Sequence, residues 1–424
     1  MRSCLTVLCA LLIASNALGQ PLEMPTEVSG PPAMLDAPQP LTLEEAESIA
    51  IASHPAIAEQ QAMIRAARGE CLQVGLAPNP TAGYTASEVG NEGNAGQQGL
   101  YVGQQFIRGN KLQLNRQVAS QQVHVLEQQL TAEMLRVRTR VRIALYKVLL
   151  TQRQVDLTTG LVDVSKQAAK TVSDLFDAKE ARRLDVLQAQ IESDRILVKL
   201  RQAEANRDAA WRELAVAMGQ PTTARRDVQA DLESLGWAYD WDTSRQMLLE
   251  GSPELAALMM DVERARAAVA RACAEPISDV SAQVSVQYDD STEDTVTGIQ
   301  VGMPIPIWNR NQGGIAKARN ELTAAQRRLE AYELQLTSQL AEKLRQYSAA
   351  KAQADAYRGG ILQRAEENLS LTRESYQAGE SNYLELLTVQ RTYFESNLDY
   401  LGSLGEVNRS VQLLNGFLLG EPTE

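Results

Sequence analysis

Residues 280–288 read VSAQVSVQY, so apolar side chains alternate without interruption with serine and glutamine. Only a β-strand uses a period of two, because successive side chains of a strand point to opposite faces. The segment is therefore predicted to be a strand with one face toward an apolar medium and the other toward water. The residues expected on the apolar face are Val280, Ala282, Val284, Val286 and Tyr288.

A second strand follows this one, and a weaker copy of the strand pair stands about two hundred residues earlier in the chain. The dipeptide Val102-Gly103 in the earlier copy matches Val301-Gly302 in the later one. Self-similarity at a fixed spacing decides the fold, because each copy is one structural unit. The four predicted strands are 81–88, 98–106, 280–288 and 295–303.

A short helical stretch precedes each strand pair. The first opens at His54-Pro55 and the second at Ser252-Pro253. Proline is favoured at the first position of a helix, and Ser is a good residue to precede it. We therefore assign His54 a structural role at a helix start.

After each strand pair, the spacing of apolar residues changes from two to between three and four, which is typical of an amphipathic helix. Proline does not occur at 111–220 or at 307–421. At 1.5 Å per residue, a helix of about sixty residues is roughly 100 Å long, and helices of that length pair as coiled coils. The two apolar stripes are Leu126, Leu130, Met134, Val137, Val141, Leu145 and Val148, and Leu322, Ala325, Leu329, Tyr332, Leu336, Leu340 and Leu344.

Each long helical segment reverses at a matched turn, FDAKE at 176–180 and YQAGE at 376–380. The helix after each turn closes on a glycine, Gly219 or Gly420, and a proline follows two residues later. Each repeat is therefore predicted to run short helix, strand, loop, strand, long helix, tight turn, long helix.

Residues 1–19 are predicted to be a signal peptide, because Arg2 precedes an apolar core and small residues flank a cleavage point after Gly19. A lipid anchor is not predicted, since Cys9 follows Val-Leu and lacks a preceding small residue. The other predicted divisions are a proline-rich leader at 20–40, a first repeat at 41–221, a linker at 222–250 and a second repeat at 251–420.

The composition excludes several classes of protein. A net charge of −12 disfavours nucleic acid as a partner. The chain has two histidines, His54 and His124, neither at ligand spacing, so we predict no metal site and no cofactor. No nucleophile elbow, phosphate-binding loop or catalytic set appears, so the protein is not expected to be an enzyme. Cys71 and Cys273 are interpreted as buried free thiols, with a disulfide as the alternative.

Four strands cannot close a membrane-spanning wall, because an open sheet would leave edge N–H and C=O groups unpaired in lipid. The mature chain has no run of eighteen apolar residues, so a transmembrane helix is not predicted either. We therefore predict a mixed α and β fold in which three copies form a 12-stranded transmembrane β-barrel, four strands from each protomer. A long periplasmic α-helical barrel is expected to continue it.

These motifs resemble the TolC-like outer-membrane efflux channels, most closely the heavy-metal and cation efflux branch. The most specific are VGMPIPI at 301–307 running into GGIAKA at 313–318, and YQAGE at 376–380 running into LELL at 384–387. The resemblance covers nearly all of 41–420. It implies a homotrimer whose strands span the outer membrane and whose helices cross the periplasm to meet an adaptor protein and an inner-membrane pump.

The resemblance also implies that the helix turns form a periplasmic tip, closed at rest. Glu385 matches an acidic position that faces the pore, and Tyr376 matches a tyrosine that helps lock the closed tip. Gly379 matches the turn glycine, which Lys179 replaces in the first repeat. Ser381 stands where the family has the basic partner of the lock.

Further acidic residues lie near the predicted tip. Asp185 is the first-repeat equivalent of the pore-facing position, and Asp174 and Asp177 precede the first turn. Thr388 occupies the place of a second acidic ring, so a single ring is expected. The alternative interpretation is that these carboxylates are solvated helix and turn residues, which Asp and Glu commonly are.

The predicted function is a passive exit duct in a tripartite efflux system, with metal cations as the first candidate for the exported solute. One alternative keeps the duct but assigns drugs, small molecules or type I secreted proteins to it. Another class of alternative is a periplasmic adaptor or a coiled-coil scaffold. Two hairpins, each preceded by a strand pair, favour the duct.

Overall fold

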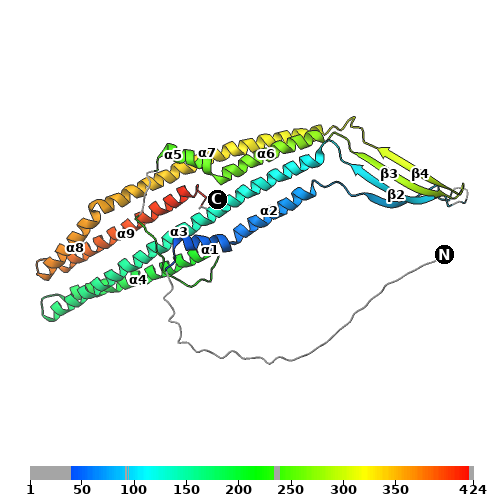
Figure 1. Ribbon diagram of the computed structural model, residues 1–424. Helices are drawn as coiled ribbons and strands as arrows, with labels where there is room; N and C mark the ends of the chain where they lie inside the picture. The colour runs from blue at the N-terminus through cyan, green and yellow to red at the C-terminus, as the bar shows by residue number, and fades with distance from the viewer. Residues whose placement is uncertain (1–39, 91–92, 94, 234–238, 420–424) are drawn as a thin grey trace, which may run out of the picture. The chain divides into compact units, whose positions relative to one another are not determined.

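The computed structural model describes residues 40–90, 93, 95–233 and 239–419, which belong to one compact unit, Pro40–Glu424 (Figure 1). The predicted signal peptide, the leader up to residue 39 and Gly420 lie outside the described residues. The first repeat contains α1 (Leu43–Ser53), α2 (Pro55–Gln73), β1 (Thr81–Ser87), β2 (Gln97–Phe106), α3 (Lys111–Asp177) and α4 (Arg183–Ala217). The second contains α5 (Trp241–Gly251), α6 (Pro253–Ala274), β3 (Val280–Asp289), β4 (Asp294–Gly302), α7 (Gln312–Ala356), η2 (Tyr357–Ile361), α8 (Leu362–Gln377) and α9 (Tyr383–Asn415).

The same order of elements occurs twice, which confirms the mixed α and β class and the internal repeat. Each repeat, however, opens with two short helices where one was predicted, and α5 lies partly within the predicted linker. The physical reason is the proline: a residue before proline is pushed out of the α region. His54 and Ser252 are accordingly extended, with ψ of 123° and 117°. Each caps the helix that follows, since its side chain accepts a hydrogen bond from Ala56 N–H (3.3 Å) or Leu255 N–H (3.4 Å).

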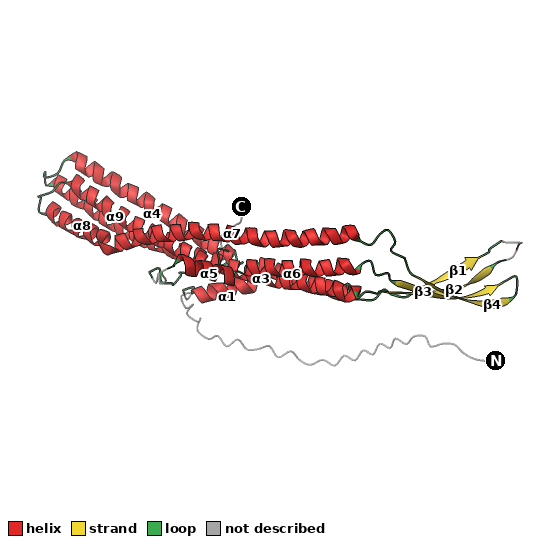
Figure 2. Ribbon diagram, turned by 90° about the horizontal axis from the view of Figure 1, so that it is seen from above, coloured by secondary structure: helices red, strands yellow, loops and turns green. Residues whose placement is uncertain are grey.

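The four strands form one antiparallel sheet in the order β1-β2-β3-β4 (Figure 2). All four predicted strands were correct to within one residue at each end. The central pairing, β2 with β3, joins the two repeats, and it sets Val102 directly opposite Val284. The sheet is therefore built across residues that are far apart in the sequence.

The first long helix, α3, continues for 67 residues without a break, and the predicted stripe is buried along its centre from Val137 to Val148. The second is interrupted, because α7 ends after 45 residues at the π-helical segment η2. The prediction of an unbroken second helix was therefore wrong. Gly359-Gly360 explains the break, since Gly360 has φ 150°, a conformation that residues with a Cβ rarely adopt.

The largest buried cluster packs α1 and the linker against α3 and α4. Leu41 pairs in parallel with Val228 and both are buried, so the start of the described chain is fastened to the linker between the repeats. Among the helices described, none is both long enough and apolar enough to cross a membrane. The buried members of this largest cluster include Ala46, Ala50, Val137, Val141, Leu145, Trp211 and Leu214.

Candidate channel wall and helical tip

The sheet has one apolar and one polar face. Directly paired residues of neighbouring strands point to the same side, so the register assigns every strand residue to a face. The mainly apolar face carries Ala82, Tyr84, Ala86, Leu100, Val102, Phe106, Val280, Ala282, Val284, Val286, Tyr288, Ile299 and Val301, together with Gln98, Gln104, Thr295 and Thr297. The opposite, mainly polar face carries Thr81, Thr85, Gln97, Gln105, Ser281, Gln283, Ser285, Gln287 and Gln300, together with Tyr101 and Val296.

The apolar face is largely open in the protomer. Ile299 is 76% exposed, Leu100 68% and Val301 67%. All five residues predicted from the 280–288 alternation lie on this face, and the other three strands extend it. An apolar patch of this kind marks a surface that contacts lipid or protein.

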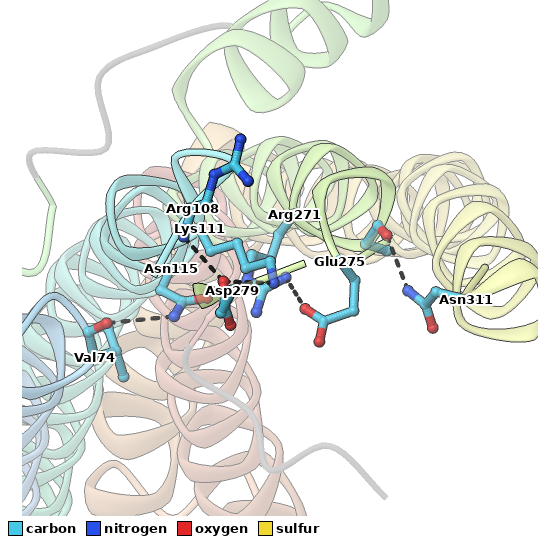
Figure 3. A network of polar contacts seen from close by, with 9 residues as sticks. Val74, Arg108, Lys111, Asn115, Arg271, Glu275, Asp279 and Asn311 are labelled. Atoms are coloured by element: carbon cyan, nitrogen blue, oxygen red, sulfur yellow. Dashed lines mark hydrogen bonds and ion pairs between the residues drawn. The ribbon is translucent and has the colours of Figure 1, made fainter. Parts of the chain in front are cut away.

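A polar network lies where the sheet meets the long helices (Figure 3). Asp279, directly before β3, accepts hydrogen bonds from Lys111 Nζ (3.0 Å) and from the backbone N–H of Arg108 (2.9 Å). Lys111 begins α3 and is only 5% exposed, so Asp279 provides the counter-charge that a buried ammonium needs. Beside this pair, Arg271 Nε donates to Asn115 Oδ1 (2.5 Å). The network connects the first repeat to the second at the base of the sheet.

At the other end of the long helices, the two turns have the same backbone. After α3, the N–H of Glu180 donates to the carbonyl of Leu175 (2.8 Å). After α8, the N–H of Glu380 donates to the carbonyl of Ser375 (2.9 Å). A hydrogen bond that spans five residues in this way terminates a helix at its C-terminal end, and it requires one residue in the left-handed conformation.

That left-handed residue is Gly379 in the second turn, with φ 76°, and Lys179 in the first, with φ 68°. A Cβ makes this conformation costly by about 1 kcal/mol, whereas glycine adopts it freely. We therefore expect Lys179→Gly to raise the free energy of unfolding by about 1 kcal/mol, and Gly379→Lys, the matched control, to lower it similarly. Urea unfolding in detergent, followed by far-ultraviolet circular dichroism, measures both. No gain in Lys179→Gly would show that the first turn is unstrained.

Asp185 lies in the first turn of α4 and binds its own neighbour. Its carboxylate accepts hydrogen bonds from the backbone N–H of Arg182 (3.2 Å) and from the guanidinium of the same residue (3.1 Å). The hydrogen bond from the Arg182 side chain lowers the pKa of Asp185, and partial burial opposes this effect. The carboxylate thus acts as an N-terminal helix cap with its cation three residues away.

The aromatic residues of the second turn pack onto the first hairpin. Tyr383 is 6% exposed, and its ring centroid lies 6.2 Å from that of Tyr376 in an edge-to-face arrangement. Burial raises the pKa of Tyr383 to about 12, and the negative charge of Glu192 adds to the effect. Burial also raises the pKa of Tyr376, with a contribution from Asp185. The first-hairpin residues in this cluster are Ala168, Val172, Val186 and Ala189.

One turn further from the tip, an ion pair joins α4 to α9. Arg391 Nε and Nη2 donate to the two carboxylate oxygens of Glu192 at 3.1 Å and 2.5 Å. The Glu192 side chain is 11% exposed, against 47% for Arg391. A cavity of about 460 Å³ lies beside the pair and is also lined by Arg195 and Phe394. A bidentate pair of this kind fixes the position of one hairpin against the other.

The other predicted tip residues are solvent-facing in the protomer. Glu385, Asp174 and Asp177 are all exposed. The backbone N–H of Glu385 donates to Asn382 Oδ1 (3.0 Å), which places the glutamate in the capped first turn of α9. The structure therefore places Asp185 near enough to Tyr376 to raise the pKa of that phenol, and it leaves Glu385 at the surface.

Cys71 and Cys273 are free thiols. Cys71 is half-buried and Cys273 is exposed, so the expectation that both are buried was wrong. The described part of the chain contains no group of three His, Cys, Asp or Glu side chains that could hold a metal ion. His124 Nδ1 lies 3.2 Å from Glu127 on the surface of α3.

Residues 245–418 match the family model described as outer membrane efflux protein. This region runs from within α5 to the end of α9 and includes β3 and β4, so it covers nearly all of the second repeat. The second repeat therefore has the sequence pattern of outer membrane efflux proteins.

A curated relative extends the similarity over both repeats. The cobalt-zinc-cadmium resistance protein CzcC of Cupriavidus metallidurans is 25% identical over 388 residues, which are 90% of this chain and 91% of that protein. The outer-membrane channel OprN has a TM-score of 0.75 at 15% identity, covering 89% of this chain and 90% of that one. The open-state MtrE outer membrane channel of Neisseria gonorrhoeae has a TM-score of 0.73 at 16% identity, covering 89% of each chain. This chain therefore has the fold of those channels.

Sequence reasoning did not identify Tyr383, the Glu192–Arg391 pair or the Lys111–Asp279 pair. Only one missed contact, the Arg182–Asp185 ion pair, could have been found from the local sequence. Oppositely charged residues that are three positions apart at the start of a helix lie close enough to interact. The two ion pairs join segments from different repeats, and no spacing rule connects such residues.

Proposed function

We propose that this chain is one protomer of a homotrimeric outer-membrane exit duct. Metal cations leave through it after an inner-membrane pump and a periplasmic adaptor have delivered them. The observation that carries the proposal is the four-stranded sheet with one apolar face, one polar face and two open edges, continued by two helical hairpins. The match of residues 245–418 to the outer membrane efflux protein model supports the duct and its place in the outer membrane.

The apolar face would contact lipid, and the opposite face, rich in Gln, Ser and Thr side chains, would line an aqueous passage. The strands β2, β3 and β4, of nine or ten residues, have the length of a tilted membrane span, and β1, of seven residues, is shorter. Three copies would supply twelve strands, a number that closes, and closure satisfies the edge groups of every strand. The chain would act passively, so the energy for export would come from the pump.

Metal cations are the proposed cargo because CzcC is named for resistance to cobalt, zinc and cadmium and aligns with 90% of this chain. Exposed Glu385 at the helical tip is consistent with such a cargo. In a trimer, three copies of this carboxylate would form a ring, which attracts cations and raises their local concentration.

Deleting the protein from its host tests the cargo. We expect tolerance to cobalt, zinc or cadmium salts to fall several-fold while tolerance to dyes and antibiotics stays unchanged, with wild-type chain restoring growth. Complementation by Glu385→Gln should give intermediate tolerance, because the duct remains but the ring loses its charge. Unchanged metal tolerance together with dye sensitivity would assign the duct to drugs or other small molecules instead.

Membrane fractionation separates the duct from a periplasmic adaptor or scaffold. The duct should require detergent for extraction from the outer membrane and should sediment as a trimer. A water-soluble monomer in the periplasmic fraction would contradict the proposal, since a soluble chain would have no use for an exposed apolar sheet face.

A further inference from the structure

The connection from β4 to α7 is longer than its counterpart from β2 to α3. Each connection runs from the glycine of the matched Val-Gly dipeptide to an asparagine of positive φ directly before the long helix. The asparagine follows Gly103 by seven positions in the first repeat, and it follows Gly302 by nine in the second. In addition, β2 pairs with β3 as far as Phe106, whereas β4 pairs with β3 only as far as Gly302. The β4–α7 connection therefore contains a stretch that no described strand accompanies.

The residues of this stretch are apolar, and all of them are exposed. Residues 303–308 read MPIPIW. Ile305 is 75% exposed and Trp308 85% exposed, and Met303 and Ile307 are also more than half exposed. A run of exposed large apolar side chains marks a surface that an apolar partner covers. The protomer alone therefore leaves apolar surface open where the sheet meets the long helices.

The apolar face of β4 reaches the length of a membrane span only when this stretch is included. On that face, the outer half of β4 carries Thr295 and Thr297. The half nearer the helices carries Ile299 and Val301, and every second residue after them is apolar as far as Ile307. This row is nine residues long, and a tilted span needs about nine to eleven residues. Because tilted strands cross a bilayer boundary at different residues, the row of β4 and the row of β3 need not be level.

The backbone of this stretch has few N–H groups that need a partner. In lipid, each unpaired N–H costs several kcal/mol. Pro304 and Pro306 have no N–H. The N–H of Ile307 donates to the carbonyl of Ile305 (2.9 Å). Since the two prolines cannot donate to a neighbouring strand either, the stretch is suited to lipid and unsuited to pairing with a strand of a second copy.

The residues that follow the apolar row are typical of a membrane surface. Trp308 comes directly after the row and Arg310 two residues later, and both are exposed. At the equivalent place in the first repeat, Arg108 is also exposed, and Figure 3 shows its guanidinium directed away from Asp279. Tryptophan side chains favour the boundary between hydrocarbon and headgroups, and arginine side chains there extend toward the polar layer. The order of an apolar row, a tryptophan and an arginine is therefore the order of the layers in one half of a bilayer.

We propose that residues 303–308 lie in the inner leaflet of the outer membrane, where phospholipid acyl chains contact Ile305 and Ile307. Trp308 then lies at the headgroup boundary, and Arg310 faces the lipid phosphates. This inference rests on the proposed outer-membrane duct, and it identifies phospholipid as the partner of a segment that lies outside the sheet. Its consequence is that the second repeat holds the junction of sheet and long helices at the membrane surface.

Spin labelling of the assembled protein tests this position. The protein with Ile305→Cys, in a Cys71→Ser, Cys273→Ser background, is labelled with a nitroxide and reconstituted into vesicles of phosphatidylethanolamine and phosphatidylglycerol. Molecular oxygen, which concentrates in hydrocarbon, should relax this label several-fold more strongly than a water-soluble nickel chelate does. The matched control is Lys317→Cys, since Lys317 is exposed on α7 beyond the apolar row. There the nickel chelate should be the stronger relaxant.

Val284→Cys, labelled in the same way, separates this inference from the proposed function, because Val284 lies on the apolar face within the sheet. Stronger relaxation by oxygen at Val284 but by nickel at Ile305 would overturn only this inference. Stronger relaxation by nickel at both would refute the lipid-facing sheet on which the inference rests. A label at Ile305 that neither reagent relaxes would show that protein covers the stretch, which would also overturn the inference. If Ile305→Cys does not assemble, Ile307→Cys, the next residue of the row, provides the same test.

Discussion

Val284→Asp is expected to remove the assembled protein from the outer membrane. Val284 lies in the middle of β3 between Val102 and Ile299, and all three side chains are exposed on the apolar face. A charged side chain facing lipid near the middle of a span costs about 2 kcal/mol, which three copies raise to roughly 6 kcal/mol per trimer. At about 1.4 kcal/mol per factor of ten, the assembly equilibrium should fall by about four orders of magnitude.

The matched control is Gln283→Asp, one residue away on the polar face, where Gly103 and Gln300 are its paired neighbours. That variant should assemble at nearly wild-type levels, because its carboxylate would face water. Outer-membrane fractions, probed by gel before and after boiling, give the amount of trimer for both variants. Normal levels of Val284→Asp trimer would show that this face does not contact lipid.

Arg391→Met should cost about 3 kcal/mol of the free energy of unfolding, because it leaves the Glu192 carboxylate buried without a counter-charge. The control is Arg195→Met, since Arg195 lines the same cavity but is exposed, and its loss should change stability by less than about 0.5 kcal/mol. Urea unfolding of the detergent-solubilised trimer, followed by circular dichroism, measures both variants.

The double variant Glu192→Leu, Arg391→Met distinguishes the cost of an unpaired buried charge from the cost of altered packing at the same place. Replacing both charges by apolar groups removes the stranded carboxylate, so most of the stability lost in Arg391→Met should return. An equal loss in the single and double variants would mean that the cost arises from packing around Phe394 and not from the unpaired charge.

The sequence alone determined the four strands, the helical hairpins that follow them and the order of these elements. The alternation at 280–288 assigned a strand and its apolar side, and the change of period after each strand pair assigned the long helices. Both signals are local, because the direction of a side chain follows from the backbone geometry of its own segment. For the same reason, Gly379 and Tyr376 could be placed at the helical tip from their position in the turn.

Tertiary structure decided which segments meet. The pairing of β2 with β3, the bond from Arg391 to Glu192 and the bond from Lys111 to Asp279 each join residues of different repeats. Such contacts depend on how whole elements pack and on the desolvation of the groups between them, which no local period encodes. The break at Gly359-Gly360 combines a local and a tertiary cause. The two glycines are visible in the sequence, but only the packed helix shows that the chain bends there.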